Sequence, residues 1–145
     1  MITKRVFYVL LVSLLFCLVS CDPSNVQSVT ELSPPSWIFG TWGDPYSILS
    51  FKFSTDHVLQ TTGSISLDFN QLIYANNLSV SQHFSESEYS FTILQNGSPI
   101  GYYQFIKLSS NSISCSISSG GVISGPCRLP LKTDTGAIIG GQNRT

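Results

Sequence analysis

Residues 89–108 read Tyr-Ser-Phe-Thr-Ile-Leu-Gln-Asn-Gly-Ser-Pro-Ile-Gly-Tyr-Tyr-Gln-Phe-Ile-Lys-Leu, and this stretch contains the clearest structural signal in the chain. In its first half, Tyr89, Phe91 and Ile93 fall on one face of an extended strand, because successive side chains point to opposite sides. Asn96-Gly97 is a residue pair that two-residue hairpin turns prefer, since both turn positions need positive φ. The stretch therefore predicts a β-hairpin whose return strand covers residues 100–108.

Similar short runs with an extended pattern lie on both sides of this hairpin, separated by turn signals. They cover residues 37–42, 49–53, 58–62, 64–69, 78–84 and 112–118. No window has a convincing helical period, so we expect no helix, and Leu72-Ile73-Tyr74 precedes a predicted turn at Asn76-Asn77. About eight strands with short connections predict an all-β antiparallel meander. Closure into an up-and-down barrel is the first expectation because it removes exposed edges, and an open sandwich is the second.

The first twenty residues have the build of a secretory signal. Lys4 and Arg5 precede the apolar run Val6–Val19, which is shorter than the roughly 20 residues of a membrane-spanning helix. The run ends in Leu18-Val19-Ser20-Cys21, which resembles the lipobox of bacterial lipoproteins. In that family the cysteine becomes the lipid-bearing first residue of the mature chain. An ordinary secretion signal that is cut near the same place is the alternative.

The lipobox resemblance implies an organisation of the chain and a compartment. It implies a signal peptide over residues 1–20 and a lipid anchor at Cys21, from which a linker without periodic apolar residues runs over 21–35. The strand pattern places a β-barrel domain over 36–130, and the glycine-rich end of the chain is expected to form a flexible tail over 131–145. Acyl chains such as palmitate on Cys21 would make a membrane of the bacterial cell envelope the first partner. Two or more chains would hold the domain there firmly, whereas one chain binds reversibly.

The charge balance disfavours one class of partner. Without the leader the chain keeps five of its seven Lys and Arg residues and all eight Asp and Glu residues, a net charge of −3. A protein without a basic patch is a poor binder of nucleic acid. We therefore expect no nucleic-acid partner.

Cys115 and Cys127 remain as a pair after the leader is removed and Cys21 is acylated. They lie 12 residues apart in a compartment that permits oxidation, so a disulfide is the expected state. A metal site is the alternative, but neither His57 nor His83 has a recognisable ligand spacing from a cysteine. We expect no metal and no cofactor.

Gly40-Thr41-Trp42 resembles the G-x-W motif of lipocalin-like (calycin) barrels. In that family the tryptophan closes the barrel floor under an arginine from near the end of the chain. The resemblance implies that Gly40 and Trp42 close the barrel here, with Arg128 as the partner and Lys107 as a substitute. A large ring after a glycine is also a core filler in any fold, and its indole N–H needs a hydrogen-bond partner when buried.

A barrel of this kind would offer an interior for a small hydrophobic ligand. The aromatic residues expected to line it are Phe51, Phe53, Phe69, Tyr89, Phe91, Tyr102, Tyr103 and Phe105. The alternative is that these rings fill the interior and that the domain binds a protein partner as an inhibitor or assembly factor of the envelope.

Residues that could support catalysis are few. No serine lies in a G-x-S-x-G elbow. His57 follows Asp56 in a predicted turn, where an aspartate normally caps its own backbone, and His83 is expected on the surface or rim of a strand. Glu86 and Glu88 are expected to act as solubilising charges, since a glycosidase pair usually comes from separate elements. The sequence therefore predicts a protein that is not an enzyme.

Overall fold

A computed structural model describes residues 27–132 apart from 44, 45 and 47, and it contains ten strands in one antiparallel sheet. The elements in chain order are β1 (Gln27–Val29), the 3₁₀ turn η1 (Ser36–Ile38), β2 (Gly40–Gly43), β3 (Leu49–Phe53), β4 (Val58–Thr62), β5 (Ile65–Asp68), α2 (Phe69–Ala75), β6 (Ser79–Phe84), β7 (Glu88–Gln95), β8 (Ser98–Ser109), β9 (Ser112–Ser119) and β10 (Val122–Lys132). Neighbours in the sheet follow the order β1-β6-β7-β8-β9-β10-β2-β3-β4-β5.

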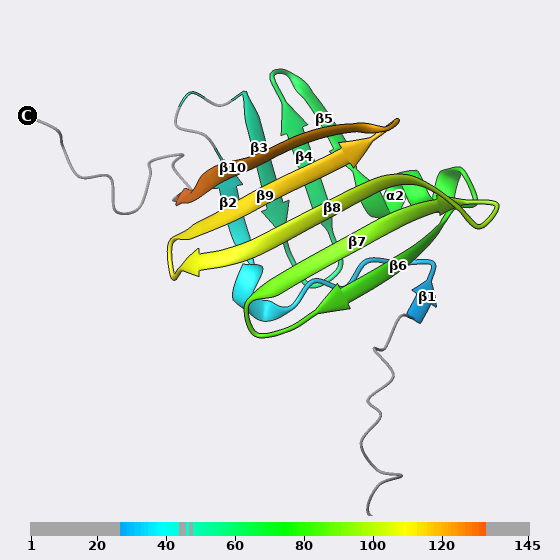
Figure 1. Cartoon of the computed structure of the whole chain (residues 1–145), viewed down its shortest axis with the longest axis horizontal. Coiled ribbons are helices and arrows are strands. Elements are labelled where there is room, and N and C mark those ends of the chain that lie inside the picture. The colour runs from blue at the N-terminus through cyan, green and yellow to red at the C-terminus, as the bar shows by residue number, and fades with distance from the viewer. Residues whose placement is uncertain (1–26, 44–45, 47, 133–145) are drawn as a thin grey trace, which may run out of the picture.

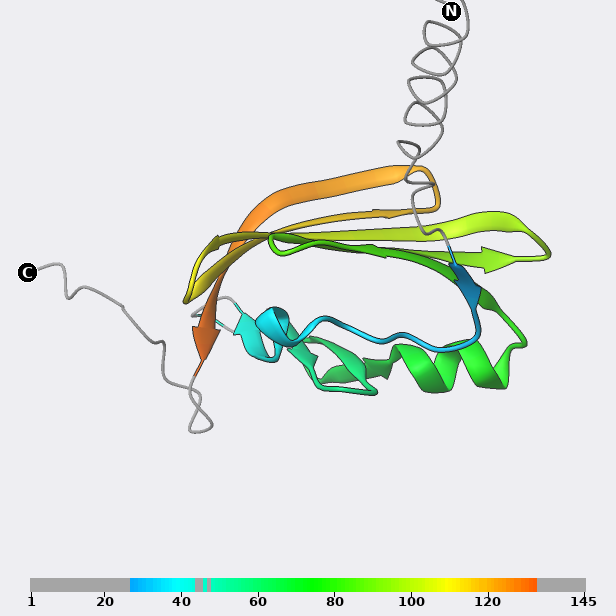
Figure 2. The same cartoon turned by 90° about the horizontal axis from the view of Figure 1, so that it is seen from below.

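The sheet curls over on itself into a half-barrel (Figures 1 and 2). β6–β10 form one layer, and β2–β5 with α2 lie beneath it. β10 connects the two layers, because it pairs with β9 along most of its length and with β2 at its end, where Leu131 lies opposite Trp42. The predicted all-β, barrel-like antiparallel meander is confirmed. Among the described strands β1 and β5 remain at the two ends of the order, so the ladder of hydrogen bonds does not form a closed ring.

The hairpin predicted around Asn96-Gly97 is confirmed. β7 and β8 pair from Gln95–Ser98 outward, and both turn residues have positive φ, 51° for Asn96 and 78° for Gly97. This combination is the one that the tight hairpin turn requires.

The expectation that the chain contains no helix is wrong at α2. The carboxylate of Asp68 accepts hydrogen bonds from the backbone N–H groups of Asn70 and Gln71, which caps the first turn. Phe69 and Ile73, four positions apart, are then buried on one side of the helix. The helix is seven residues long, too short for its period to be recognised in a longer sequence window.

The predicted boundaries of the domain also need correction at both ends. Residues 27–35 were assigned to a linker, but they contain β1 and the fully buried Leu32. The tail was predicted from residue 131, but β10 continues to Lys132 and pairs with β2 there. The leader, Cys21 and residues 133–145 lie outside the described residues.

The core lies between the two layers. It consists of buried aliphatic and aromatic side chains from both, and its largest fully buried members are Trp42, Tyr89 and five phenylalanines. Buried apolar area of this kind is the main stabilising term of a small domain.

Candidate functional site

The predicted ligand-lining residues divide into two groups. Seven of them are buried in the interior: Phe51, Phe53, Phe69, Tyr89, Phe91, Tyr103 and Phe105. Tyr102 is 37% exposed, and the prediction that it lines the interior is wrong. Tyr102 and Tyr103 are neighbours in β8, and neighbouring side chains of a strand point to opposite faces.

The seven interior rings pack against one another. The Phe105 ring lies edge-on to Phe51 and Phe53, with ring centroids 5.0 Å and 4.9 Å away. The Phe91 and Tyr103 rings stack at 4.8 Å. These separations are those of aromatic side chains in direct contact. The space between the layers is therefore filled where these rings meet, and the rings act as core.

The open side of the half-barrel is covered by residues 27–35, which we call the N-terminal strap. Figure 2 looks onto this side and shows the chain running from β1 towards η1 between the upper layer and α2. Leu32 is fully buried and belongs to the core cluster. The strap thus closes the core with its own apolar side chain.

Gln82 of β6 holds one side of the strap. Its side chain is 7% exposed, and its Oε1 accepts hydrogen bonds from the Ser33 backbone N–H (3.2 Å) and the Tyr89 hydroxyl (3.3 Å). Its Nε2 donates to the Glu31 carbonyl (3.2 Å) and to the Ser33 hydroxyl (3.4 Å). A buried amide needs such partners, because an unpaired polar group in the interior is costly. Gln82 therefore fixes the strap at a defined position.

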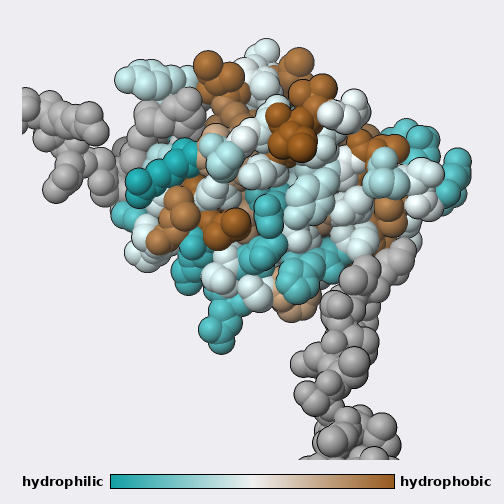
Figure 3. Space-filling model, in the orientation of Figure 1, coloured by the Kyte–Doolittle hydropathy of each residue, from teal (hydrophilic) through white to brown (hydrophobic). Residues whose placement is uncertain are grey.

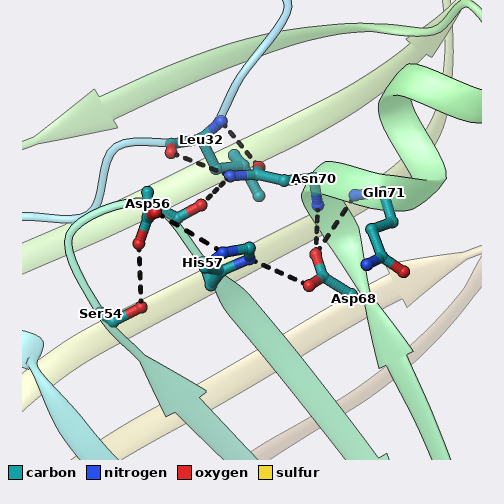
Figure 4. Close-up of polar contacts among 7 residues, drawn as sticks. All are labelled: Leu32, Ser54, Asp56, His57, Asp68, Asn70 and Gln71. Atoms are coloured by element: carbon teal, nitrogen blue, oxygen red, sulfur yellow. Dashed lines mark hydrogen bonds and ion pairs between the residues drawn. The ribbon is translucent and has the colours of Figure 1, made fainter.

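Asn70 of α2 holds the other side (Figure 4). Its Oδ1 accepts a hydrogen bond from the Leu32 backbone N–H (2.9 Å), and its Nδ2 donates to the Leu32 carbonyl (3.4 Å) and to the Asp56 carbonyl. One side chain thus joins the strap, the β3–β4 turn and the helix.

His57 lies beside this junction, between two carboxylates (Figure 4). Its Nδ1 is 3.0 Å from Asp68 Oδ2 and its Nε2 is 3.5 Å from Asp56 Oδ2. Asp68 caps α2 with its other oxygen, and Asp56 Oδ1 accepts from the Ser54 hydroxyl at 3.5 Å. The sequence placed His57 next to Asp56 but gave no sign of Asp68, which is brought near by the pairing of β4 with β5. The arrangement joins a turn to a helix N-terminus, which is a structural task.

The other polar candidates lie on the surface. His83 is exposed in β6, and Glu86 is exposed in the turn that follows. Glu88 is partly buried, and its Oε1 accepts a hydrogen bond from Gln104 Nε2 at 2.8 Å. In the described part of the chain, no group of three or more His, Cys, Asp or Glu side chains is placed to hold a metal ion.

Two surface depressions lie on either side of the strap. One, of about 480 Å³, is lined by Thr30 and Glu31 together with residues of α2 and the turn after it, including Tyr74. The other, of about 590 Å³, is lined by strap residues 29–33 with Thr55, Gln82 and Phe84. Tyr74 is 88% exposed and Phe84 58% exposed. Two exposed aromatic rings therefore flank the strap.

The outer face of β8 carries a stripe of apolar side chains. Its members, which we call the β8 stripe, are Ile100, Tyr102, Ile106 and Leu108, each between 37% and 52% exposed. Their register neighbours on β9 include Ser118 and Ser114, so the stripe has a hydroxyl border. A depression of about 440 Å³ adjoins Ile100 and Tyr102 at one end. Figure 3 shows this layer from outside, with hydrophobic groups in brown set among hydrophilic ones.

The predicted disulfide is not formed. Cys115 and Cys127 lie opposite each other on β9 and β10, and both are free thiols. The Cys127 thiol donates to the carbonyl of Cys115 at 3.5 Å, so it is directed at the backbone. Burial, with a smaller contribution from Cys127, raises the pKa of the Cys115 thiol.

Trp42 is a buried core residue, and its indole N–H donates to the Ile38 carbonyl at 2.6 Å. Gly40 has a φ of +121°, and a Cβ there would come within 2.9 Å of Leu131, so this position requires glycine. The two residues expected to close the barrel over Trp42 have other partners. Arg128 donates to the Ser112 hydroxyl, and Lys107 lies over the Trp37 ring.

Comparison of the chain with protein-family models, with curated proteins and with solved structures gives no match. Among the described residues, no helix has the length and hydrophobicity needed to cross a bilayer.

Proposed function

We propose that this protein is a non-catalytic lipoprotein of the bacterial cell envelope, anchored through Cys21, whose β-domain works by binding another protein. The lipobox-like residues 18–21 support the anchor. The packed interior supports binding to another protein, and the choice of a protein partner over a small ligand depends on this observation. Seven of the eight aromatic residues expected to line a ligand site are instead in the core. A domain whose interior is occupied by its own rings acts through its surface.

The β8 stripe is the part of that surface best suited to a protein partner. It offers four partly exposed apolar side chains along one strand, with Gln104 between Tyr102 and Ile106, and hydroxyl groups that can form hydrogen bonds lie beside it. Protein interfaces commonly have an apolar, aromatic centre and a polar rim. Tyr102, next to the depression at one end of the stripe, is the residue that a partner would cover first.

The anchor is tested by labelling cells with an alkyne fatty acid. The wild-type chain should become labelled, and Cys21→Ala should not. Label that persists in the variant would place the acyl group elsewhere, and an unlabelled wild-type chain would rule out the anchor.

The partner is tested by placing a photo-crosslinking amino acid at position 102 in living cells. We expect one discrete crosslinked product from position 102 and none from position 65, where Ile65 is more accessible (74% against 37% exposed) but belongs to β5. Diffuse products from both positions would contradict the assignment of the stripe.

A small hydrophobic ligand in the interior is the second candidate function. It is favoured by the resemblance of Gly40-Thr41-Trp42 to lipocalin-like barrels. Native mass spectrometry separates the two functions, because a co-purified lipid, released on denaturation, is expected for a carrier and not for a filled domain.

A further inference from the structure

We infer that the domain rests with its strap face against the surface of a neutral phospholipid bilayer, an inference that rests on the proposed lipid anchor at Cys21. The strap face is the N-terminal strap together with the residues that line the two depressions beside it. Tyr74 and Phe84 would enter the headgroup boundary on either side of the strap.

The length of the tether is the first argument. Five residues, 22–26, separate Cys21 from Gln27, where β1 begins. Six steps between Cα atoms cover at most about 22 Å even in a fully extended chain. An acylated Cys21 lies at the membrane surface, so β1 cannot be farther than this from the bilayer. The tether therefore holds the edge of the domain that carries β1 within reach of the lipid.

The exposed rings are the second argument. Tyr74 lines one depression with Thr30 and Glu31, and Phe84 lines the other with Val29 and Thr30. Their exposures of 88% and 58% leave large apolar surfaces in water. Aromatic side chains favour the membrane–water interface, where the ring is in an apolar layer and a polar group can remain hydrated. Both rings lie on the face that the tether holds close to such an interface.

The charge of this face selects the kind of lipid. Among the residues that line the two depressions, Glu31 is the one with a charged side chain, and it is exposed. The others are apolar residues or carry hydroxyl or amide groups, which hydrogen-bond to headgroups without a net charge. An exposed carboxylate is repelled by anionic headgroups, with a range of about 10 Å at moderate salt. A zwitterionic surface is therefore preferred.

This orientation leaves the β8 stripe accessible. β8 is three strands away from β1 in the sheet order, and its stripe faces outward. One face can thus contact the membrane while the other is presented to a protein.

The test uses the full chain, extracted from bacterial membranes and reconstituted into phosphatidylcholine vesicles that contain a photoactivatable phospholipid with a diazirine near the glycerol end of its acyl chain. After illumination, lipid adducts are mapped on peptides by mass spectrometry. The variant Tyr74→Ser/Phe84→Ser is compared with the control Ile65→Ser/Ile123→Ser. The control residues are 74% and 78% exposed and lie on β5 and β10, away from the strap. All four positions are exposed, and thermal melting verifies that both variants fold.

We expect adducts in the peptides that contain residues 74 and 84, their loss in the first variant and no change in the control. Replacing half of the lipid with phosphatidylglycerol at low salt should lower the yield. Adducts spread equally over residues 65 and 123, or absent from residues 74 and 84, would overturn the inference. The intact mass of the same sample separates the two proposals: an unacylated chain refutes the anchor, whereas an acylated chain without these adducts refutes the orientation alone.

Discussion

Replacing Leu32 with alanine tests whether the strap is part of the folded domain. The Leu32 side chain is fully buried in the core cluster, and its backbone N–H and carbonyl are both held by Asn70. The Leu32→Ala change removes three buried carbon atoms, so their transfer free energy is lost and a cavity remains. Such changes lower the free energy of unfolding by about 3 kcal/mol. For a domain of this size that corresponds to a fall in Tm of about 12 °C.

The assay is thermal and urea unfolding followed by tryptophan fluorescence, which reports on Trp37 and Trp42 of the domain. Thr30→Ala is the matched control, because Thr30 is exposed in the same strap and its replacement should change stability by less than about 0.5 kcal/mol. If Leu32→Ala unfolds within the error of Thr30→Ala, the strap is a mere linker and the reasoning from burial is refuted.

Three further predictions concern contacts inside the domain. Asn70→Ala removes three hydrogen bonds and should lower the free energy of unfolding by about 2 kcal/mol in urea titrations. The control Gln71→Ala, at an exposed helix position, should have little effect, and equal effects of the two variants would contradict the role of the Asn70 amide. Trp42→Phe leaves a buried carbonyl unpaired and should cost about 2 kcal/mol in the same assay, so wild-type stability would show that the indole bond is unimportant. Burial raises the pKa values of the Cys115 thiol and the Tyr89 hydroxyl, so the folded chain keeps protons that the unfolded chain releases near pH 9 and 10. These two groups should lower the free energy of unfolding as the pH rises above about 8, and an unfolding midpoint unchanged between pH 8 and pH 11 would contradict this.

The β-strands were predictable from local patterns. The alternation over residues 89–93 and the Asn96-Gly97 turn act within a few residues, so a hairpin follows from them directly. Buried phenylalanines such as Phe91 were recognised as interior for the same reason. The interior position given to Tyr102 was avoidable, because it contradicts the alternation that placed Tyr103.

Other features depend on residues far apart in the sequence. Leu32 and Val29 are the two aliphatic residues of the otherwise polar, proline-ended N-terminal strap, and the hydrogen bonds that hold Leu32 in place come from Asn70 and, through its neighbour Ser33, from Gln82, which are 38 and more residues away. The seven-residue helix depends on its cap at Asp68 and on packing of Phe69. No strand was predicted over residues 122–130, where Gly125 and Pro126 interrupt the pattern, although Gly120 and Gly121 both have positive φ and form the turn that starts β10.

The mass of the native protein, extracted from bacterial membranes and measured first under native and then under denaturing conditions, tests the central claim most directly. We predict the mass of residues 21–145 plus covalent acyl groups, identical under both conditions. A chain that keeps its leader and lacks acyl groups, or a lipid that is present in the native spectrum and lost on denaturation, would contradict an anchored domain with a filled interior.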